Sequence, residues 1–370
     1  MKYYLIAGEA SGDLHGGRLI RELKKRQPQA HFRAWGGDFM QAQGAEIVRH
    51  YRDLAFMGFA EVVRNLPAIW RNFRFCESDL LAFRPDVVVL IDYPGFNMRL
   101  LPFLKKHGFR VVWYISPQLW AWNASRVVKI RRYVDQMLCI LPFEQEWYAR
   151  HAVQARYVGH PLLDALHEFE PSNQFLADHQ LVGGGYLALL PGSRTQEIRK
   201  ILPAMLRTAA RFPGYPVVVA GAPNQPADRY LDFKGIAPFT LVQGQTYDVL
   251  LHARAAMVTS GTATLETALA GCPLLVAYKG SALSYAIGKR LVKVPFISLV
   301  NLIAGRELVR ECIQDACHPG PMGDELELLL HDEGRRGVLK QGFSTLRAQL
   351  GGVGASQRAA EAILGLGGGI

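Results

Sequence analysis

The segment Leu190-Pro-Gly-Ser-Arg194 has the residue types of a phosphate-binding turn between a short apolar run and a helical pattern. Ser193 and Gln196 have the spacing of a capping box, which holds the first turn of a helix. Free N–H groups at a helix start attract anions, and the planar guanidinium of Arg194 matches phosphate geometry. The pattern therefore predicts that Gly192, Ser193 and Arg194 bind a phosphate.

A second turn of this kind, Ser260-Gly261-Thr262, follows another apolar run and opens another helical pattern. Glu266 lies four residues after Thr262, so the two side chains share one side of the helix. A carboxylate there could accept hydrogen bonds from a ribose diol, although a plain surface glutamate is equally compatible with the local sequence. Two phosphate-ready turns in one half of the chain predict a site for a nucleotide diphosphate.

Asp92 ends the most hydrophobic predicted strand, residues 86–92, and precedes a Pro94-Gly95 bend. Partial burial there would raise its basicity and suit it to general-base work. The alternative is a turn aspartate that only stabilises the bend.

The motif Gly8-Glu-Ala-Ser-Gly-Asp13 follows the first predicted strand and opens a helix that also contains Gly16 and Gly17. Glycine costs a helix about 1 kcal/mol relative to alanine, so a ligand or another backbone is expected to approach closely. A helix packed tightly on its sheet is the alternative. The motif is not G-x-G-x-x-G, which disfavours a dinucleotide site.

Short apolar strands alternate with helical segments along the whole chain, which is typical of parallel α/β units. The series restarts after a polar stretch, residues 167–174. We therefore predict two Rossmann-like, doubly wound α/β domains that face each other across a cleft. Strands are expected at residues 3–7, 86–92, 110–115, 136–140, 186–190, 217–220, 255–259 and 273–277.

Composition limits the possible partners. The chain has 370 residues, 49% hydrophobic and 20% charged, and a net charge of +10. The basic residues are scattered and match no nucleic-acid-binding signature, which favours phosphorylated substrates or an anionic membrane over nucleic acid. Five cysteines without metal-ligand spacing indicate reduced thiols in the cytoplasm, no metal site and no cofactor. No apolar stretch is long enough to span a bilayer, and the N-terminus does not resemble a signal peptide.

One predicted helical face is unusually apolar and is flanked by arginines, with a kink or a restart expected at Pro67. It is either a core helix or a patch that dips into a membrane surface. The residues of this patch are Phe59, Val62, Val63, Leu66, Ile69 and Trp70.

Taken together, the motifs resemble one family, the lipid-A-disaccharide synthases. The resemblance covers residues 4 to about 310 in family order, and its most specific parts are Trp120-Ala-Trp122 and the last motif. The motifs are Gly8-Glu-Ala-Ser-Gly-Asp13, Ile91-Asp-Tyr-Pro-Gly-Phe-Asn97, Tyr114-Ile-Ser-Pro-Gln-Leu-Trp-Ala-Trp122, Leu141-Pro-Phe-Glu144, Gly159-His-Pro161, Leu190-Pro-Gly-Ser-Arg194, Ser260-Gly-Thr-Ala263 with Glu266, and Asn301-Leu-Ile-Ala-Gly-Arg-Glu307.

The resemblance implies a GT-B glycosyltransferase on the inner-membrane surface, with a UDP-diacylglucosamine donor and the acceptor 2,3-diacylglucosamine 1-phosphate (lipid X). The product would be a β-1,6 disaccharide, and UDP would leave. It also implies an acceptor domain at residues 1–165, completed by helices at about 340–370, and a donor domain at residues 175–339.

The same resemblance assigns roles to residues. Asp92 matches the proposed base, and Glu9 and Ser11 match acceptor-side residues. The nucleotide side comprises Gly192, Ser193, Arg194, Ser260, Gly261, Thr262, Glu266 and Asn301. Many members have aspartate at Gly95 and proline at Val300, and the first difference places more weight on Asp92.

The predicted mechanism is an inverting, in-line displacement without a metal, because no D-x-D sequence occurs. Two competing hypotheses are a UDP-sugar epimerase, suggested by Gly159-His-Pro161, and a non-catalytic UDP-sugar-binding protein at the membrane surface. A homodimer is plausible from the basic and aromatic composition.

Overall fold

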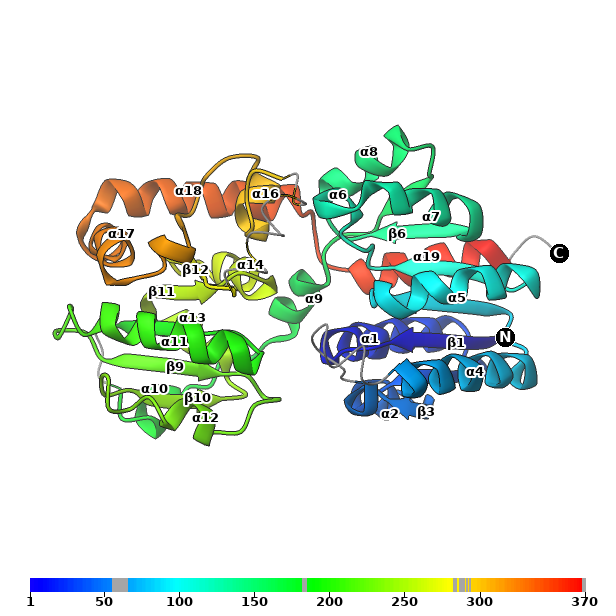
Figure 1. Ribbon diagram of the computed structural model, residues 1–370, viewed down its shortest axis with the longest axis horizontal. Helices are drawn as coiled ribbons and strands as arrows, with labels where there is room; N and C mark the ends of the chain where they lie inside the picture. The colour runs from blue at the N-terminus through cyan, green and yellow to red at the C-terminus, as the bar shows by residue number, and fades with distance from the viewer. Residues whose placement is uncertain are drawn as a thin grey trace. The chain divides into compact units, whose positions relative to one another are not determined.

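The computed structural model describes residues 1–54, 66–181, 185–281, 285, 290, 292 and 294–367. The chain forms two compact units (Figure 1). Unit 1 comprises Met1–Asp164 and Gly352–Ile370, and unit 2 comprises Ala165–Gly351.

Within the described residues, unit 1 contains a seven-stranded parallel sheet in the order β3-β2-β1-β4-β5-β6-β7. Its strands are β1 (Lys2–Ala7), β2 (His31–Gly36), β3 (Glu46–His50), β4 (Val87–Ile91), β5 (Arg110–Tyr114), β6 (Gln136–Cys139) and β7 (Ala155–Tyr157). Its helices are α1 (Ala10–Arg26), α2 (Asp38–Ala42), η1 (Tyr51–Leu54), α4 (Leu66–Phe83), α5 (Pro94–Lys106), α6 (Leu119–Trp122), η2 (Ala124–Arg126), α7 (Val127–Tyr133), α8 (Pro142–Arg150) and α19 (Ala355–Gly367), and α9 (Pro161–Glu168) leads into unit 2.

The described part of unit 2 contains a six-stranded sheet, again parallel, in the order β10-β9-β8-β11-β12-β13. Its strands are β8 (Tyr186–Leu190), β9 (Val217–Gly221), β10 (Thr240–Gln243), β11 (Ala253–Thr259), β12 (Leu274–Tyr278) and β13 (Glu311–Ile313). Its helices are α10 (Phe175–Asp178), α11 (Thr195–Ala209), α12 (Asp228–Leu231), α13 (Thr246–His252), α14 (Thr262–Leu269), α16 (Leu299–Ala304), η3 (Gln314–Ala316), α17 (Pro319–His331) and α18 (Glu333–Gln349).

The predicted α/β class is confirmed, and a strand occurs at each of the eight expected places. The prediction missed five strands. The outer strands β3, β7, β10 and β13 are short or partly exposed, so they lack the continuous apolar run that marks a buried strand. The sequence of β2 interrupts its apolar residues with Arg33.

The unit 1 sheet is buried on both faces because the side chains of each strand alternate between them. Tyr3 and Leu5 of β1 pack with α1 and α19, whereas Tyr4 and Ile6 pack with α4 and α5. The two apolar clusters explain why β1, β4 and β5 are almost wholly hydrophobic.

The glycines of α1 let the helix pack closely on its neighbours. A Cβ on Gly16 would lie 2.0 Å from the Cε atom of Met40, and one on Gly17 would lie 2.8 Å from the carbonyl oxygen of Phe39. Tight packing, the alternative weighed from the sequence, therefore accounts for both glycines.

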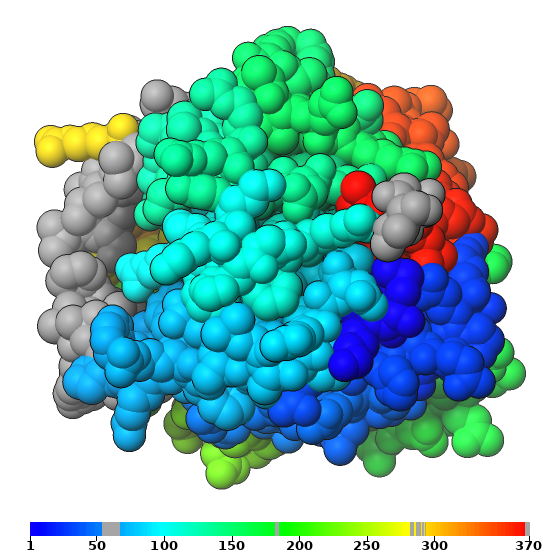
Figure 2. Space-filling view, turned by 90° about the vertical axis from the view of Figure 1, so that its right-hand side faces the viewer, coloured from blue at the N-terminus to red at the C-terminus, as the bar shows by residue number. Residues whose placement is uncertain are grey.

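The C-terminal helix α19 returns to unit 1 and packs on α1, so red and blue segments lie side by side in Figure 2. The Asp164 carboxylate accepts hydrogen bonds from the backbone N–H groups of Gly354 (2.5 Å), Ala355 (3.3 Å) and Ser356 (3.1 Å) and so stabilises the helix start. The return begins at Gly352, later than the expected position near 340, because α18 packs against α14 and α16 of unit 2.

No helix in the described part of the chain is both long and apolar enough to cross a membrane.

Candidate functional site

In each unit most of the predicted catalytic and nucleotide-binding residues lie where the winding of the sheet reverses; Asn301, on α16, does not. In unit 1 the reversal lies between β1 and β4, which are followed by Glu9 and Ser11 at the start of α1 and by Asp92. In unit 2 it lies between β8 and β11, followed by residues 191–194 and 260–262. Neighbouring loops diverge at such a point and leave a crevice at the carboxyl ends of the strands.

Asp92 and Tyr93 form a sharp turn between β4 and α5. Both have left-handed backbone angles, with φ of 45° and 50°, which non-glycine residues rarely adopt. The turn is held because the Asp92 N–H donates to the Tyr114 carbonyl (3.2 Å), and the Asn97 side-chain amide donates to the Asp92 carbonyl (2.8 Å). Strained turns of this kind cluster at functional sites.

Gly8 permits the two unit 1 motifs to meet. A Cβ at Gly8 would lie 2.3 Å from the Tyr93 ring, so any other residue would displace that ring. The close approach places the loop after β1 directly beside the turn that contains Asp92.

The Asp92 carboxyl is half-buried. Its pKa is raised to about 7, mainly by burial and to a smaller extent by the charges of Glu9 and Glu144, while a hydrogen bond from the Tyr93 backbone opposes the rise. A carboxylate that titrates near neutral pH can accept a proton from a hydroxyl group more readily than an ordinary aspartate. The physical requirement for general-base chemistry is thus met.

Glu9 and Ser11 are exposed at the start of α1, where Glu9 is the N-cap residue and the Asp13 N–H donates to its carbonyl (3.0 Å). Their side chains are accessible to a ligand. Asp13, in contrast, is buried, and its carboxylate accepts N–H bonds from Gly37 (2.7 Å), Phe39 (3.0 Å) and Met40 (3.1 Å). It therefore holds the α2 turn.

The start of α11 differs from the predicted capping box. Helix α11 begins at Thr195 with Arg194 as its N-cap, so Ser193 and Gln196 do not form the box. Instead the Glu197 carboxylate accepts the Arg194 N–H (3.2 Å). A charged carboxylate is a stronger acceptor than the amide of Gln196, which accounts for the one-residue shift.

Glu197 lies close to Gly192 and forms an ion pair with Arg194. Gly192 has a φ of 101°, and a Cβ there would lie 2.4 Å from a Glu197 carboxylate oxygen. The Arg194 guanidinium, 57% exposed, forms an ion pair with Glu197 at 3.2 Å. Exposed ion pairs contribute little to stability. Arg194 could therefore leave Glu197 and bind a phosphate at the α11 N-terminus at a small cost in free energy.

At the second turn, the Ser260 hydroxyl donates to the Ile297 carbonyl (2.9 Å), and exposed Thr262 opens α14. The first N–H groups of a helix have no partner within it, so the turn can bind an anion. Glu266 lies one turn further on, where its carboxylate accepts a hydrogen bond from the Tyr247 hydroxyl (3.0 Å) and burial raises its pKa.

Asn301 is fully buried, and its side chain forms hydrogen bonds with the nearby segment 308–311. Its side-chain N–H groups donate to Val309 (2.8 Å) and Glu311 (2.9 Å), and its oxygen accepts from the N–H groups of Leu308 (2.8 Å) and Val309 (2.9 Å). An amide has two donor hydrogens and two acceptor lone pairs, so these bonds use its whole capacity. Asn301 is therefore placed to position the 308–311 segment, and direct ligand binding would require those bonds to break.

Two structurally important glutamates, the buried Glu144 and the half-buried Glu311, were not among the predicted site residues. Glu311 accepts hydrogen bonds from Ser298 and Asn301, and Glu144 binds the segment that contains Trp120. A sequence signal existed for Glu144, since Pro142 and Glu144 have the spacing of a helix start, and the structure shows that start at α8. In the part of the chain that the structure describes, no group of three or more His, Cys, Asp or Glu could hold a metal.

The fold is similar to those of several solved structures. A UDP-GlcNAc 2-epimerase from Neisseria meningitidis bound to UDP-GlcNAc has a TM-score of 0.69 at 14% identity, covering 99% of this chain and all of that one. The calicheamicin glycosyltransferase has a TM-score of 0.61 at 18% identity and covers 100% and 98%. Both likenesses concern the fold alone, which is that of GT-B glycosyltransferases and epimerases.

Sequence comparison is more specific. The family model for lipid-A-disaccharide synthetase matches residues 3–364. The lipid-A-disaccharide synthase of Myxococcus xanthus is 39% identical over 98% of this chain and 96% of its own length. That of Sodalis glossinidius is 41% identical over 98% and 97%. The chain therefore belongs to the lipid-A-disaccharide synthase family and is a GT-B glycosyltransferase of lipid A biosynthesis.

Proposed function

We propose that the protein joins UDP-2,3-diacylglucosamine to 2,3-diacylglucosamine 1-phosphate, forming a β-1,6 disaccharide and releasing UDP. The observation that supports this reaction best is Asp92, a carboxylate with a pKa raised to about 7 at the winding reversal of unit 1. The match of the family model over residues 3–364 supports our proposal that this carboxylate is the base.

We assign the acceptor to unit 1. Asp92 takes the proton of the acceptor 6-hydroxyl, and the resulting oxygen nucleophile attacks the anomeric carbon as the bond to UDP breaks. The configuration at that carbon inverts, and UDP carries away the bonding electrons. Exposed Glu9 and Ser11 lie at the neighbouring start of α1 and are suited to orient the acceptor.

We assign the donor to unit 2. The α11 and α14 N-termini, with Gly192, Ser193, Ser260, Gly261 and Thr262, offer backbone N–H groups to the diphosphate. The charge that develops on UDP is stabilised by these dipoles and by Arg194, without a metal. Glu266 accepts the ribose hydroxyls, and Asn301 acts indirectly by holding its loop.

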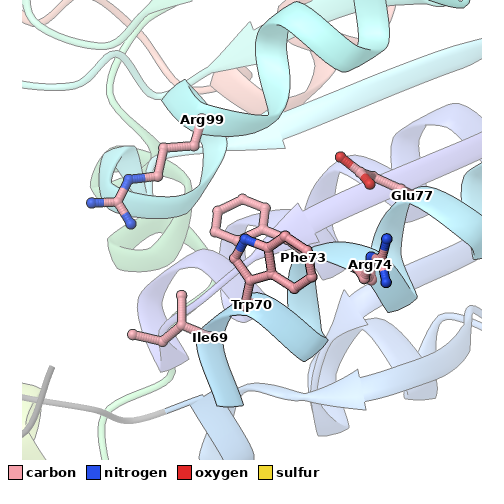
Figure 3. Close-up of a pocket in the computed structure, with 6 residues that line it drawn as sticks. All are labelled: Ile69, Trp70, Phe73, Arg74, Glu77 and Arg99. Atoms are coloured by element: carbon pink, nitrogen blue, oxygen red, sulfur yellow. The ribbon is translucent and has the colours of Figure 1, made fainter. Parts of the chain in front are cut away.

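We also propose that unit 1 binds the cytoplasmic surface of the inner membrane through α4. Trp70 is 61% exposed, and an open groove of about 420 Å³ runs past it. Figure 3 shows Ile69, Trp70, Phe73, Arg74 and Glu77 along α4, with Arg99 on α5. An aromatic ring flanked by arginines suits an anionic bilayer surface. The predicted patch residues Phe59, Val62 and Val63 lie outside the described residues, and Leu66 begins α4.

The competing hypotheses are less favoured. The epimerase likeness rests on fold at 14% identity, whereas the synthase relatives are about 40% identical over nearly the whole chain. His160 of Gly159-His-Pro161 is buried, and burial lowers its pKa to about 3. A neutral, enclosed imidazole suits a structural role. Self-association stays a prediction, which the mass of the purified protein in solution would test.

Asp92 should set the pH dependence of the reaction. Because a base must be deprotonated to act, kcat/KM should rise as pH increases through about 7 and fall below it. Asp92→Asn should lower kcat by about 100-fold or more while the protein stays folded, since an amide cannot accept the proton. Disaccharide formation measured from pH 5.5 to 9 tests both statements. Near-normal turnover by the folded variant would remove Asp92 from the base role.

Glu266 should recognise the ribose of the donor. Glu266→Ala should raise the UDP dissociation constant about tenfold, because a charged hydrogen bond is lost. Calorimetry with UDP and 2′,3′-dideoxy-UDP sharpens the test: the native protein should prefer UDP, and the variant should bind both alike. Tyr247→Phe is the matched control, since it removes the hydroxyl that contacts Glu266 but keeps the carboxylate. If Glu266→Ala retained full discrimination between the two ligands, the ribose assignment would be wrong.

Trp70 should contribute to membrane binding. Trp70→Ser should weaken co-sedimentation with vesicles containing anionic phospholipid by about tenfold, the effect expected from losing a large apolar contact. Leu81→Ser is the control, because Leu81 is also exposed (43%) but lies near the other end of α4. Equal effects of the two substitutions would contradict a localised patch.

A further inference from the structure

The Glu144 carboxylate is a buried hub at the carboxyl edge of the unit 1 sheet. Only 1% of Glu144 is exposed. It accepts hydrogen bonds from the Ser116 hydroxyl, the Trp120 indole N–H (3.0 Å), and the backbone N–H groups of Leu141 (3.0 Å) and Ile140 (3.3 Å). Ser116 lies in the loop after β5 and Trp120 on the short helix α6 that follows it, whereas Leu141 and Ile140 belong to the loop after β6.

These partners favour a charged carboxylate. Burial raises the pKa of Glu144 above its usual range, and the four hydrogen bonds oppose that rise. The indole and the two backbone N–H groups can only donate, and they meet both oxygens of the carboxylate. This geometry favours the ionised form of Glu144.

Hydrogen bonds connect this hub to the turn at Asp92. The Asp92 N–H donates to the carbonyl of Tyr114, the last residue of β5. The next residue, Ile115, has a φ of 64°, and its N–H donates to Leu138 of β6 (3.1 Å). Glu144 then ties the following residue, Ser116, to the end of β6. The end of β5 therefore supports the left-handed turn at Asp92, together with the hydrogen bond from Asn97.

The charge of Glu144 is also close enough to act on Asp92. β4 and β6 are separated only by β5, which corresponds to about 10 Å between the strand ends. The charged and titratable groups that act on Asp92 are Glu9 and Glu144, whose charges raise its pKa, and the Tyr93 backbone N–H opposes them.

We propose that Glu144 is a positioning residue for the acceptor site: its carboxylate clamps the ends of β5 and β6 beside Asp92 and supplies a fixed negative charge that keeps Asp92 a good proton acceptor. The inference rests on the proposed role of Asp92 as the base. A residue that only capped α8 would support folding but would not influence the titration of Asp92.

The test is the acid limb of the pH profile of kcat/KM for Glu144→Gln. Removal of the charge should move that limb to lower pH by about 0.3 to 1 unit, as expected for one charge that acts through a partly shielded setting. Glu146→Gln is the matched control: the same substitution on the same helix, at an exposed residue paired with Arg150. Its profile should match that of the native protein.

Two further variants separate the effect of the Glu144 charge from that of its hydrogen bonds to the ends of β5 and β6. Glu144→Asp keeps the charge but shortens the reach, and Ser116→Ala removes one donor. Both should lower kcat about tenfold without moving the acid limb to lower pH. If Glu144→Gln does not fold, unchanged kcat in these two variants would still overturn the clamp.

The results distinguish a failure of the proposed role of Glu144 from a failure of the proposed base, Asp92. If Asp92→Asn is inactive but the acid limb of folded Glu144→Gln matches that of the native protein, the role of Glu144 is refuted and the base survives. If Asp92→Asn stays active, the base assignment fails first.

Discussion

In each unit the chain reverses its direction of winding between two adjacent parallel strands, β1 and β4 in unit 1 and β8 and β11 in unit 2. The loops on either side of a reversal turn away from each other, which leaves backbone and side chains accessible at the strand ends. Most of the predicted catalytic and nucleotide-binding residues follow these strands, whereas Asn301 lies on α16. The carboxylate proposed as the base and the anion-binding turns can therefore belong to separate units. Each lies at the carboxyl ends of the strands where its sheet reverses its winding.

Buried or half-buried carboxylates hold neighbouring segments together in both units. Asp13, Glu144 and Asp164 of unit 1 and Glu311 of unit 2 accept hydrogen bonds from backbone N–H groups of neighbouring segments. Leaving such donors without a partner would cost on the order of 1–3 kcal/mol each, so other conformations of these loops are disfavoured. An acidic residue that is enclosed by N–H donors is thus structural, whereas Asp92, which is half-buried and has a raised pKa, suits the base role that we propose for it.

Much of this arrangement is predictable from the sequence. Continuous apolar runs such as residues 86–91 indicate buried parallel strands, and a turn rich in small residues indicates a helix start. Two features escape such patterns. The shift of the α11 cap to Arg194 depends on the competition between Gln196 and Glu197 for one N–H group. The enclosure of Asn301 depends on a chain segment that folds back from residues 308–311, which no local spacing reveals.

The central claim is transfer of a sugar from a UDP donor to a lipid acceptor without a metal. It is tested most directly by UDP release from UDP-2,3-diacylglucosamine, with and without 2,3-diacylglucosamine 1-phosphate, in detergent and a chelator. The account predicts release that depends on the acceptor, persists in the chelator and matches the disaccharide formed. Release at the same rate without the acceptor, or no release at all from a protein that still binds UDP, would contradict it.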